Sequence, residues 1–220
     1  MDYKITNING GIRVTGLNNF SPQHIFENGQ AFRWEKTESD SYIVVAFGKV
    51  AEFYMEGNDL IALNTNEEDF RKIWHHYFSL DRDYNELKDN LRKTLAYSLN
   101  NSLKEAMEFG HGLRILNQDH FEMIISFIIS ANNQIPRIKK SVDLLAQTYG
   151  DPIEEYKGKL YFSFPRPDQL AFEDPEKLKE ITRVGFRNER IVTAARTYLE
   201  TMEKFETDDL NILKESLIAL

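Results

Sequence analysis

The sequence of 220 residues contains no cysteine, which excludes disulfides, thiolate metal sites and a cysteine nucleophile. It also lacks an apolar run of the roughly 18 residues that a membrane-spanning helix needs. The first ten residues, MDYKITNING, lack the apolar core of a signal peptide. These absences predict an intracellular protein that is neither secreted nor inserted in a membrane.

Positive charge is also scarce, because 27 lysines and arginines face 35 acidic residues and the net charge is −8. Taken over the whole chain, this balance argues against binding to nucleic acid, where lysine and arginine neutralise phosphates. A nucleic-acid site would therefore need a local cluster of lysine and arginine. No phosphate-binding glycine loop, nucleophile elbow or dinucleotide fingerprint is present.

Histidines and acidic clusters give no catalytic pattern either. The five histidines have no metal-ligand spacing, so no metal site is expected: His24, His75, His76, His111 and His120. The acidic clusters 67–69 and 208–209 stand at expected helix N-termini, where carboxylates favour the helix dipole. We interpret them as helix-stabilising rather than as paired catalytic carboxylates.

The first part of the chain predicts an antiparallel sheet. Short runs rich in β-branched and aromatic residues alternate with turn signals at 3–8, 12–16, 31–35, 42–48, 49–55 and 59–65. Ser21 and Pro22 have the capping chemistry of a short helix, and Gly29 can close it in a left-handed conformation.

From Thr65 onward the apolar residues recur with the spacing of a helix. Thr65 and Glu68 have capping-box spacing, and two apolar stripes follow: Phe70, Ile73, Trp74, Tyr77 and Phe78, then Tyr84, Leu87, Leu91 and Leu95. Asp119 and Glu122 open a run that is apolar nearly all round, which predicts a central buried helix. We therefore expect an α+β fold, with an N-terminal antiparallel sheet and flanking helices at 1–117 packed on a helical domain at 118–220.

In "SFIISANNQIPRI", residues 126–138, the apolar run ends at amides. The segment 132–140 contains no acid and carries Asn132, Asn133, Arg137 and two lysines. Amides and arginine hydrogen-bond base edges, and lysines can meet phosphate. The alternative is that the asparagines only cap a helix and that Arg137 is solvated.

A second segment, "LKEITRVGFRNERI", joins two expected helices, the first of which starts at Asp174-Pro175 and runs to Gly185. It places Phe186 and Arg187 at a tight turn between Arg183 and Arg190. An exposed aromatic ring beside arginine suits insertion into a base stack. The alternative is that Phe186 packs in the core.

Four stretches together resemble the 8-oxoguanine DNA glycosylase/AP lyases of the helix-hairpin-helix superfamily: "NGQAFRW", "GLRILNQDHFEMIISFIISANNQIPRI", "LYFSFPRPDQLA" and "ITRVGFRNERI". The resemblance implies DNA repair by base flipping and excision of 8-oxoguanine opposite cytosine, with duplex DNA as partner. It implies a monomer without a metal or cofactor, in the cytoplasm or nucleoid if the protein is bacterial.

The resemblance also implies roles for single residues. The carbonyl of Gly29 would accept a hydrogen bond from the N7–H that 8-oxoguanine has and guanine lacks. Asn132, Arg137 and Arg187 would hold the unpaired cytosine, Asn133 would belong to the same DNA-binding turn, and Phe186 would wedge into the stack. The family usually has asparagine and proline where this chain has Gln134 and His120.

The catalytic motif of the family is missing from these 220 residues. Neither its glycine-rich hairpin with a lysine nucleophile nor the following aspartate is present, so we expect the catalytic residues beyond Leu220 and an incomplete helical domain. The apolar stripe Leu213, Leu217, Ile218 and Leu220, which ends without a C-cap, supports that expectation. The alternatives to an 8-oxoguanine glycosylase are a non-catalytic DNA- or protein-binding module and a glycosylase for alkylated bases.

Overall fold

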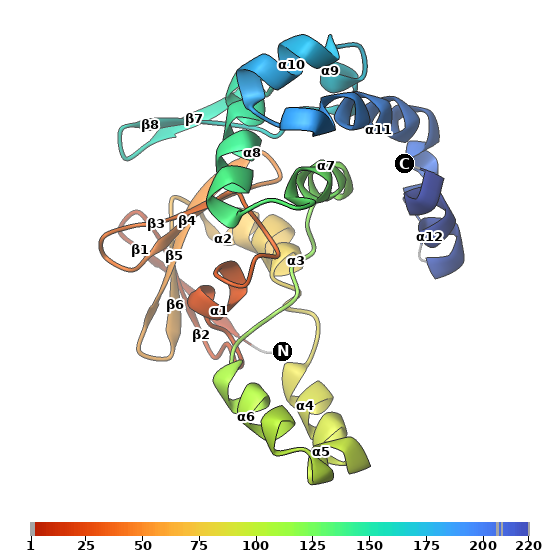
Figure 1. The fold of residues 1–220 in the computed structure, drawn as a ribbon. Helices are drawn as coiled ribbons and strands as arrows, with labels where there is room; N and C mark the ends of the chain where they lie inside the picture. The colour runs from red at the N-terminus through yellow and green to blue at the C-terminus, as the bar shows by residue number, and fades with distance from the viewer. Residues whose placement is uncertain (1–2, 206, 208, 220) are drawn as a thin grey trace. The chain divides into compact units, whose positions relative to one another are not determined.

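The computed structural model describes residues 3–205, 207 and 209–219 (Figure 1). The chain folds as two compact units, each with its own core. One comprises Met1–Val45 and Val50–Asn117, and the other comprises Ala46–Lys49 and Gln118–Leu220. Among the described residues, no helix is both long enough and apolar enough to cross a bilayer.

The N-terminal unit is built around a six-stranded sheet in the order β1-β2-β6-β5-β4-β3, with antiparallel pairings that confirm the predicted sheet. The fully buried side chains of Ile12, Val14 and Leu60 show where neighbouring strands face the core. The strands are β1 (Lys4–Ile8), β2 (Gly11–Thr15), β3 (Trp34–Lys36), β4 (Tyr42–Ala46), β5 (Lys49–Glu56) and β6 (Asp59–Leu63).

Short helices complete this unit: α1 (Pro22–Phe26), α2 (Glu67–Asp69), the π-helical turn Phe70–Trp74, α3 (His75–Tyr77), α4 (Tyr84–Arg92), α5 (Leu95–Leu99) and α6 (Asn101–Phe109). The aromatic core is confirmed, because the ring of Phe53 lies 4.9 Å from Trp74 and 5.0 Å from Phe78 between centroids. The predicted capping box is wrong by one residue. Asn66, not Thr65, caps α2 by accepting the backbone N–H of Asp69 at 2.9 Å.

The apolar stripe predicted after Asp81 is only partly buried. Tyr84 is buried, but Leu87 is 54% exposed and Leu91 is only half-buried. The side chain of Leu95 lies outside the described part. The helices α4 to α6 extend away from the sheet in Figure 1, so the stripe has little of its own unit to pack against.

The second unit is mainly helical, with α7 (His120–Ser130), α8 (Ile135–Tyr149), α9 (Pro167–Ala171), α10 (Pro175–Thr182), the 3-10 turn Gly185–Arg187, α11 (Asn188–Thr201), the 3-10 turn Met202–Phe205 and α12 (Leu210–Ala219). A two-stranded sheet, β7 (Pro152–Tyr156) and β8 (Lys159–Phe162), was not predicted. Its strand sequence PIEEY lacks the alternation of apolar and polar residues that identifies a half-buried strand.

Helix α7 begins as predicted, because the Asp119 carboxylate accepts the backbone N–H of Glu122 at 2.8 Å. Its inner face is buried, but Phe127 is 58% exposed, so burial on all sides is wrong. Helix α10 stops at Thr182 rather than at Gly185, because Arg183 adopts a left-handed conformation with φ 59°. In α12, Leu217 and Ile218 are exposed and Leu213 is half-buried, while Leu220 lies outside the described residues.

Candidate functional site

The turn between α7 and α8 divides its two asparagines into different roles. Asn133 is a cap: its Nδ2 donates to the Ile129 carbonyl at 3.1 Å, and its Oδ1 accepts the Gln134 N–H at 2.9 Å. Asn132 is exposed at φ 50°, and its side chain makes no hydrogen bond to the described residues. The capping alternative therefore holds for Asn133 but not for Asn132, whose amide is available to a ligand.

The turn between α10 and α11 presents an aromatic ring to solvent. Phe186 is 74% exposed, so the alternative in which it packs in the core is wrong. The preceding turn contains Arg183 at φ 59° and Gly185 at φ 66°. The left-handed region costs a residue with a side chain about 1–2 kcal/mol, whereas glycine adopts it freely.

Arg187 joins the two turns. It is only 8% exposed, and its Nη1 donates to the Val184 carbonyl at 3.2 Å. Its Nη2 donates to the carbonyl of Asn132 at 3.3 Å and also to that of Ala131. The guanidinium carbon lies 4.3 Å from the centroid of the Phe186 ring. The Nε–H is buried without a hydrogen-bond partner among the described residues, so one donor of this side chain remains unsatisfied.

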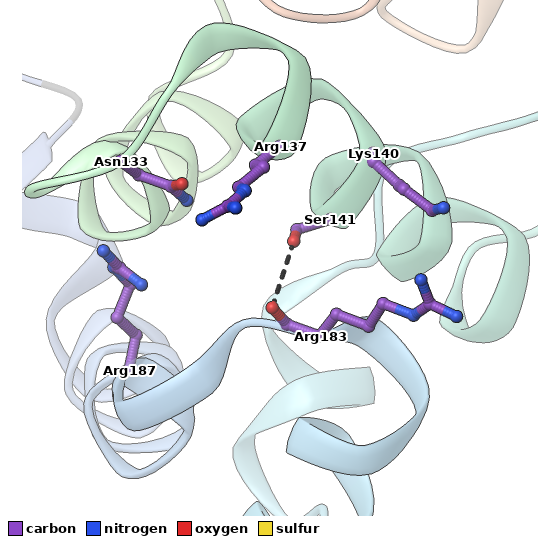
Figure 2. A pocket seen from close by; sticks show the side chains of 6 residues that line it. All are labelled: Asn133, Arg137, Lys140, Ser141, Arg183 and Arg187. Atoms are coloured by element: carbon purple, nitrogen blue, oxygen red, sulfur yellow. Dashed lines mark hydrogen bonds between the residues drawn. The ribbon is translucent and has the colours of Figure 1, made fainter.

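The two turns and α8 surround a hollow of about 470 Å³ (Figure 2). It is lined by Asn133, Arg137, Lys140, Ser141, Arg183 and Arg187. The residues from α8 share one helix face, because positions i, i+3 and i+4 are neighbours on a helix. Four of the six lining side chains are cationic and none is acidic. A chain with net charge −8 thus has a local basic surface that can attract an anion.

Sequence patterns predict part of this hollow. Asn133, Arg137 and Arg187 line it, whereas Asn132 and Phe186 stand in its two turns without lining it. Ser141 was missed, although its helical spacing from Arg137 was a usable signal. Arg183 was noted only as a flanking charge. Its contribution depends on the left-handed backbone, which the sequence does not reveal.

Gly29 belongs to the N-terminal unit, where it adopts φ 86° in the turn after α1. The neighbouring Gln30 side chain is fixed by three hydrogen bonds. Its Nε2 donates at 2.9 Å to the carbonyls of Ile25 and Arg114, and its Oε1 accepts the Leu116 N–H at 3.0 Å. The turn that carries the Gly29 carbonyl is therefore anchored at its next residue.

A second anchor of this turn is Glu27, the C-cap residue of α1. Its Oε1 accepts hydrogen bonds from the Tyr42 hydroxyl at 2.6 Å and from Lys36 Nζ at 3.0 Å. These bonds, that from Tyr42 above all, hold the pKa of Glu27 below its ordinary value. Burial, followed by the bond to Glu27, raises the pKa of Tyr42 to about 12.

The described histidine, aspartate and glutamate side chains form no group of three that could hold a metal ion. The acidic cluster at 67–69 occupies the first turn of α2, as expected of dipole-stabilising residues. Asp209 accepts the backbone N–H of Asn211 at 2.8 Å, and Asp208 lies outside the described residues.

Comparison with protein families identifies residues 13–124 with the N-terminal domain of 8-oxoguanine DNA glycosylase. The chain belongs to this family. Two solved structures match the whole of this chain, and the match covers 74% of the length of each. One is MBOgg1 in complex with a low-affinity DNA ligand, at 39% identity and a TM-score of 0.90. The other is the Clostridium acetobutylicum 8-oxoguanine glycosylase/lyase with duplex DNA containing cytosine opposite 8-oxoG, at 38% and 0.89.

Curated relatives in the family are longer than this chain. The N-glycosylase/DNA lyase of Saccharomyces cerevisiae is 29% identical over 192 residues, which are 79% of this chain and 48% of that protein. The chain thus spans about half the length of the curated relatives it matches. The 3-methyladenine DNA glycosylase of Archaeoglobus fulgidus, at 15% identity and a TM-score of 0.59, shares the fold alone.

Proposed function

We propose that this protein recognises 8-oxoguanine opposite cytosine in duplex DNA and flips the damaged base out of the helix. One observation carries the proposal: Arg187 binds the backbone of the α7–α8 turn and supports an exposed aromatic ring at the same time. The two turns that the family resemblance assigns to DNA are thus joined by one side chain. The likeness to glycosylase structures with bound DNA supports the same function.

Extrusion of a base costs a few kcal/mol of unpairing and unstacking. In our proposal, Phe186 fills the vacated stack, and its exposed ring is already held against the Arg187 guanidinium. The cytosine left behind has base-edge groups that must regain partners. The free Asn132 amide and the exposed Arg137 supply donors and an acceptor for them, and Arg187, which lines the hollow, is proposed as the third contact.

Lesion discrimination is proposed for the Gly29 carbonyl. A carbonyl accepts a hydrogen bond, so it binds the N7–H of 8-oxoguanine and is left unsatisfied against the N7 lone pair of guanine. The backbone N–H of Gln30, which shares a peptide plane with this carbonyl, donates to Asn28 Oδ1 at 2.9 Å and so holds the plane in place. A single fixed acceptor can therefore discriminate against an undamaged base.

Base removal is proposed for the whole protein. A lysine amine would attack C1′ of the sugar, the base would leave, and the resulting Schiff base would permit strand cleavage as AP lyase activity. None of the 220 residues matches the family's lysine motif. We therefore assign recognition and extrusion to these residues, and we further propose that the protein acts as an intracellular monomer.

Single-turnover cleavage of a duplex with 8-oxoguanine opposite cytosine tests the proposal, with borohydride trapping to detect the Schiff base. Parallel duplexes should carry an alkylated purine or guanine. We expect the full-length protein to excise 8-oxoguanine and to be trapped on that duplex. The polypeptide of residues 1–220 should bind the lesion weakly and excise nothing. Excision of the alkylated base alone, or binding without lesion preference, would contradict the proposal.

A further inference from the structure

None of the four cations of the basic hollow makes an ion pair within the part of the chain that the structure describes. Arg187 is held by backbone carbonyls, which leaves Arg137, Lys140 and Arg183. Nearby cations behave differently. Lys177 binds Glu173 at 3.1 Å and Lys179 binds Glu176 at 3.0 Å, both on or beside α10. Unpaired cations that share a concave surface without an acid attract an anionic ligand.

Lys140 and Arg183 form a pair of their own within this hollow. Figure 2 shows the Lys140 ammonium and the Arg183 guanidinium extending on one side, away from Asn133 and Arg187. The Ser141 hydroxyl donates to the Arg183 carbonyl at 3.4 Å, which attaches the α10–α11 turn to α8. Because Ser141 follows Lys140 directly, this bond brings the backbone at Lys140 close to the backbone at Arg183.

The backbone conformation of Arg183 does not explain an arginine at this position. At φ 59° and ψ 26° it occupies the left-handed region, which glycine adopts without strain. The Arg183 backbone N–H already caps α10 by donating to the Lys179 carbonyl at 3.1 Å, and glycine would do the same. Residues held in such conformations cluster at ligand-binding sites. The exposed guanidinium is the feature that glycine would lack.

We propose that Lys140 and Arg183 form a separate subsite that binds a phosphodiester group of the DNA backbone. Arginine matches phosphate with a planar fork of donors, and lysine adds a compact charge. Such a contact positions the duplex and carries no base information. The proposal rests on the proposed function, in which Asn132, Arg137 and Arg187 read the unpaired base instead.

Arg183→Gly is the decisive variant, because it removes the guanidinium and relieves the backbone strain. Thermal stability should be equal to or higher than that of the parent. On undamaged duplex, the slope of log Kobs against log salt concentration should decrease in magnitude by about 0.9. Lys140→Gln should have the same effect, and the double variant should lose about 1.8. Binding should weaken equally with each of the four bases opposite 8-oxoguanine.

Two matched variants control for net charge. Lys177→Gln removes one positive charge outside the hollow and should leave the slope unchanged. Arg183→Lys keeps the charge in the hollow and should retain the parent slope. An unchanged slope in both Arg183→Gly and Lys140→Gln would overturn the proposal. So would a loss of affinity that depends on the opposite base.

The same measurements separate this inference from the proposed function. If the parent binds undamaged and lesion duplex equally, lesion recognition fails, while the subsite is still judged by its slope on undamaged DNA. If the lesion preference is present and the slopes of the variants do not change, the phosphate subsite is rejected and the proposed function stands. A parent that binds no duplex at low salt would overturn both.

Discussion

Arg187 Nη2 donates a hydrogen bond of 3.3 Å to the backbone carbonyl of Asn132, although the two residues are 55 positions apart. The bond joins the turn that carries the free amide to the turn that carries the exposed ring. The Arg187 side chain is therefore part of the local structure as well as a candidate ligand for cytosine. Variants at this position must be tested for both effects.

Arg187→Ala should lower the free energy of unfolding by about 1–3 kcal/mol, because it removes charge-assisted bonds to carbonyls at a buried position. It should also weaken binding by about 1–3 kcal/mol when cytosine faces the lesion, and relax the preference among opposite bases. Urea unfolding and binding titrations on four duplexes measure the two effects. The exposed neighbour Arg190 supplies the control, since Arg190→Ala should change neither. Equal weakening on all four duplexes would remove Arg187 from base reading.

Phe186→Ala should leave thermal stability close to that of the parent, because the ring is 74% exposed. It should impair base extrusion, measured with a fluorescent base analogue beside the lesion, because no ring remains to fill the stack. Phe121, which is buried in the same unit, supplies the contrast. Phe121→Ala should lose about 3–5 kcal/mol of stability. A large drop in melting temperature for Phe186→Ala with normal extrusion would refute the stacking role.

Gly29→Ala should destabilise the protein by about 1–2 kcal/mol, because alanine is strained at φ 86°. It should also reduce the preference for 8-oxoguanine over guanine, because relief of that strain moves the carbonyl. Gly57→Ala, at φ 62° in a hairpin with open space around it, is the control for strain alone. Competition binding with both duplexes measures the preference. The carbonyl role is rejected if both variants discriminate as well as the parent.

Glu27→Gln should lower stability at neutral pH and flatten the acid side of the stability profile. The folded pKa of Glu27 lies below its ordinary value of 4.5, so its carboxylate stabilises the fold above that pH. This stabilisation is lost as the pH falls through the folded pKa. Because the side chain is partly exposed, solvent screens the effect. Urea unfolding between pH 3 and 7 measures it, and a difference that persists undiminished at pH 3 would contradict the assignment.

Helix caps were mostly readable without the structure, because the deciding contact lies within one turn of the chain. Ser21 and Asp119 cap their helices as predicted, because each side chain reaches an N–H three residues on. The predicted strands pair because their β-branched and aromatic runs have few other stable conformations. Thr65 failed as a cap because Asn66, an equally capable residue, stands next to it.

Burial was less predictable, because an apolar stripe shows which face of a helix can be buried and not what covers it. Leu87 and Phe127 continue apolar patterns, yet both side chains are exposed. Phe186 could not be decided between core and surface from sequence. Its exposure follows from the left-handed residues before it and from Arg187, whose guanidinium lies against the ring.

The sequence by itself determined the α+β fold class, the family and the residue types of the two turns, because these depend on local pattern and composition. Only the tertiary structure showed that Arg187 binds the backbone beside Asn132 and that Arg183 extends into the hollow with Lys140. The physical reason is the path of the chain. Residues 43 to 55 positions apart come together only after α8, α10 and the turns between them have packed, and the left-handed backbone of Arg183 sets the direction of its side chain.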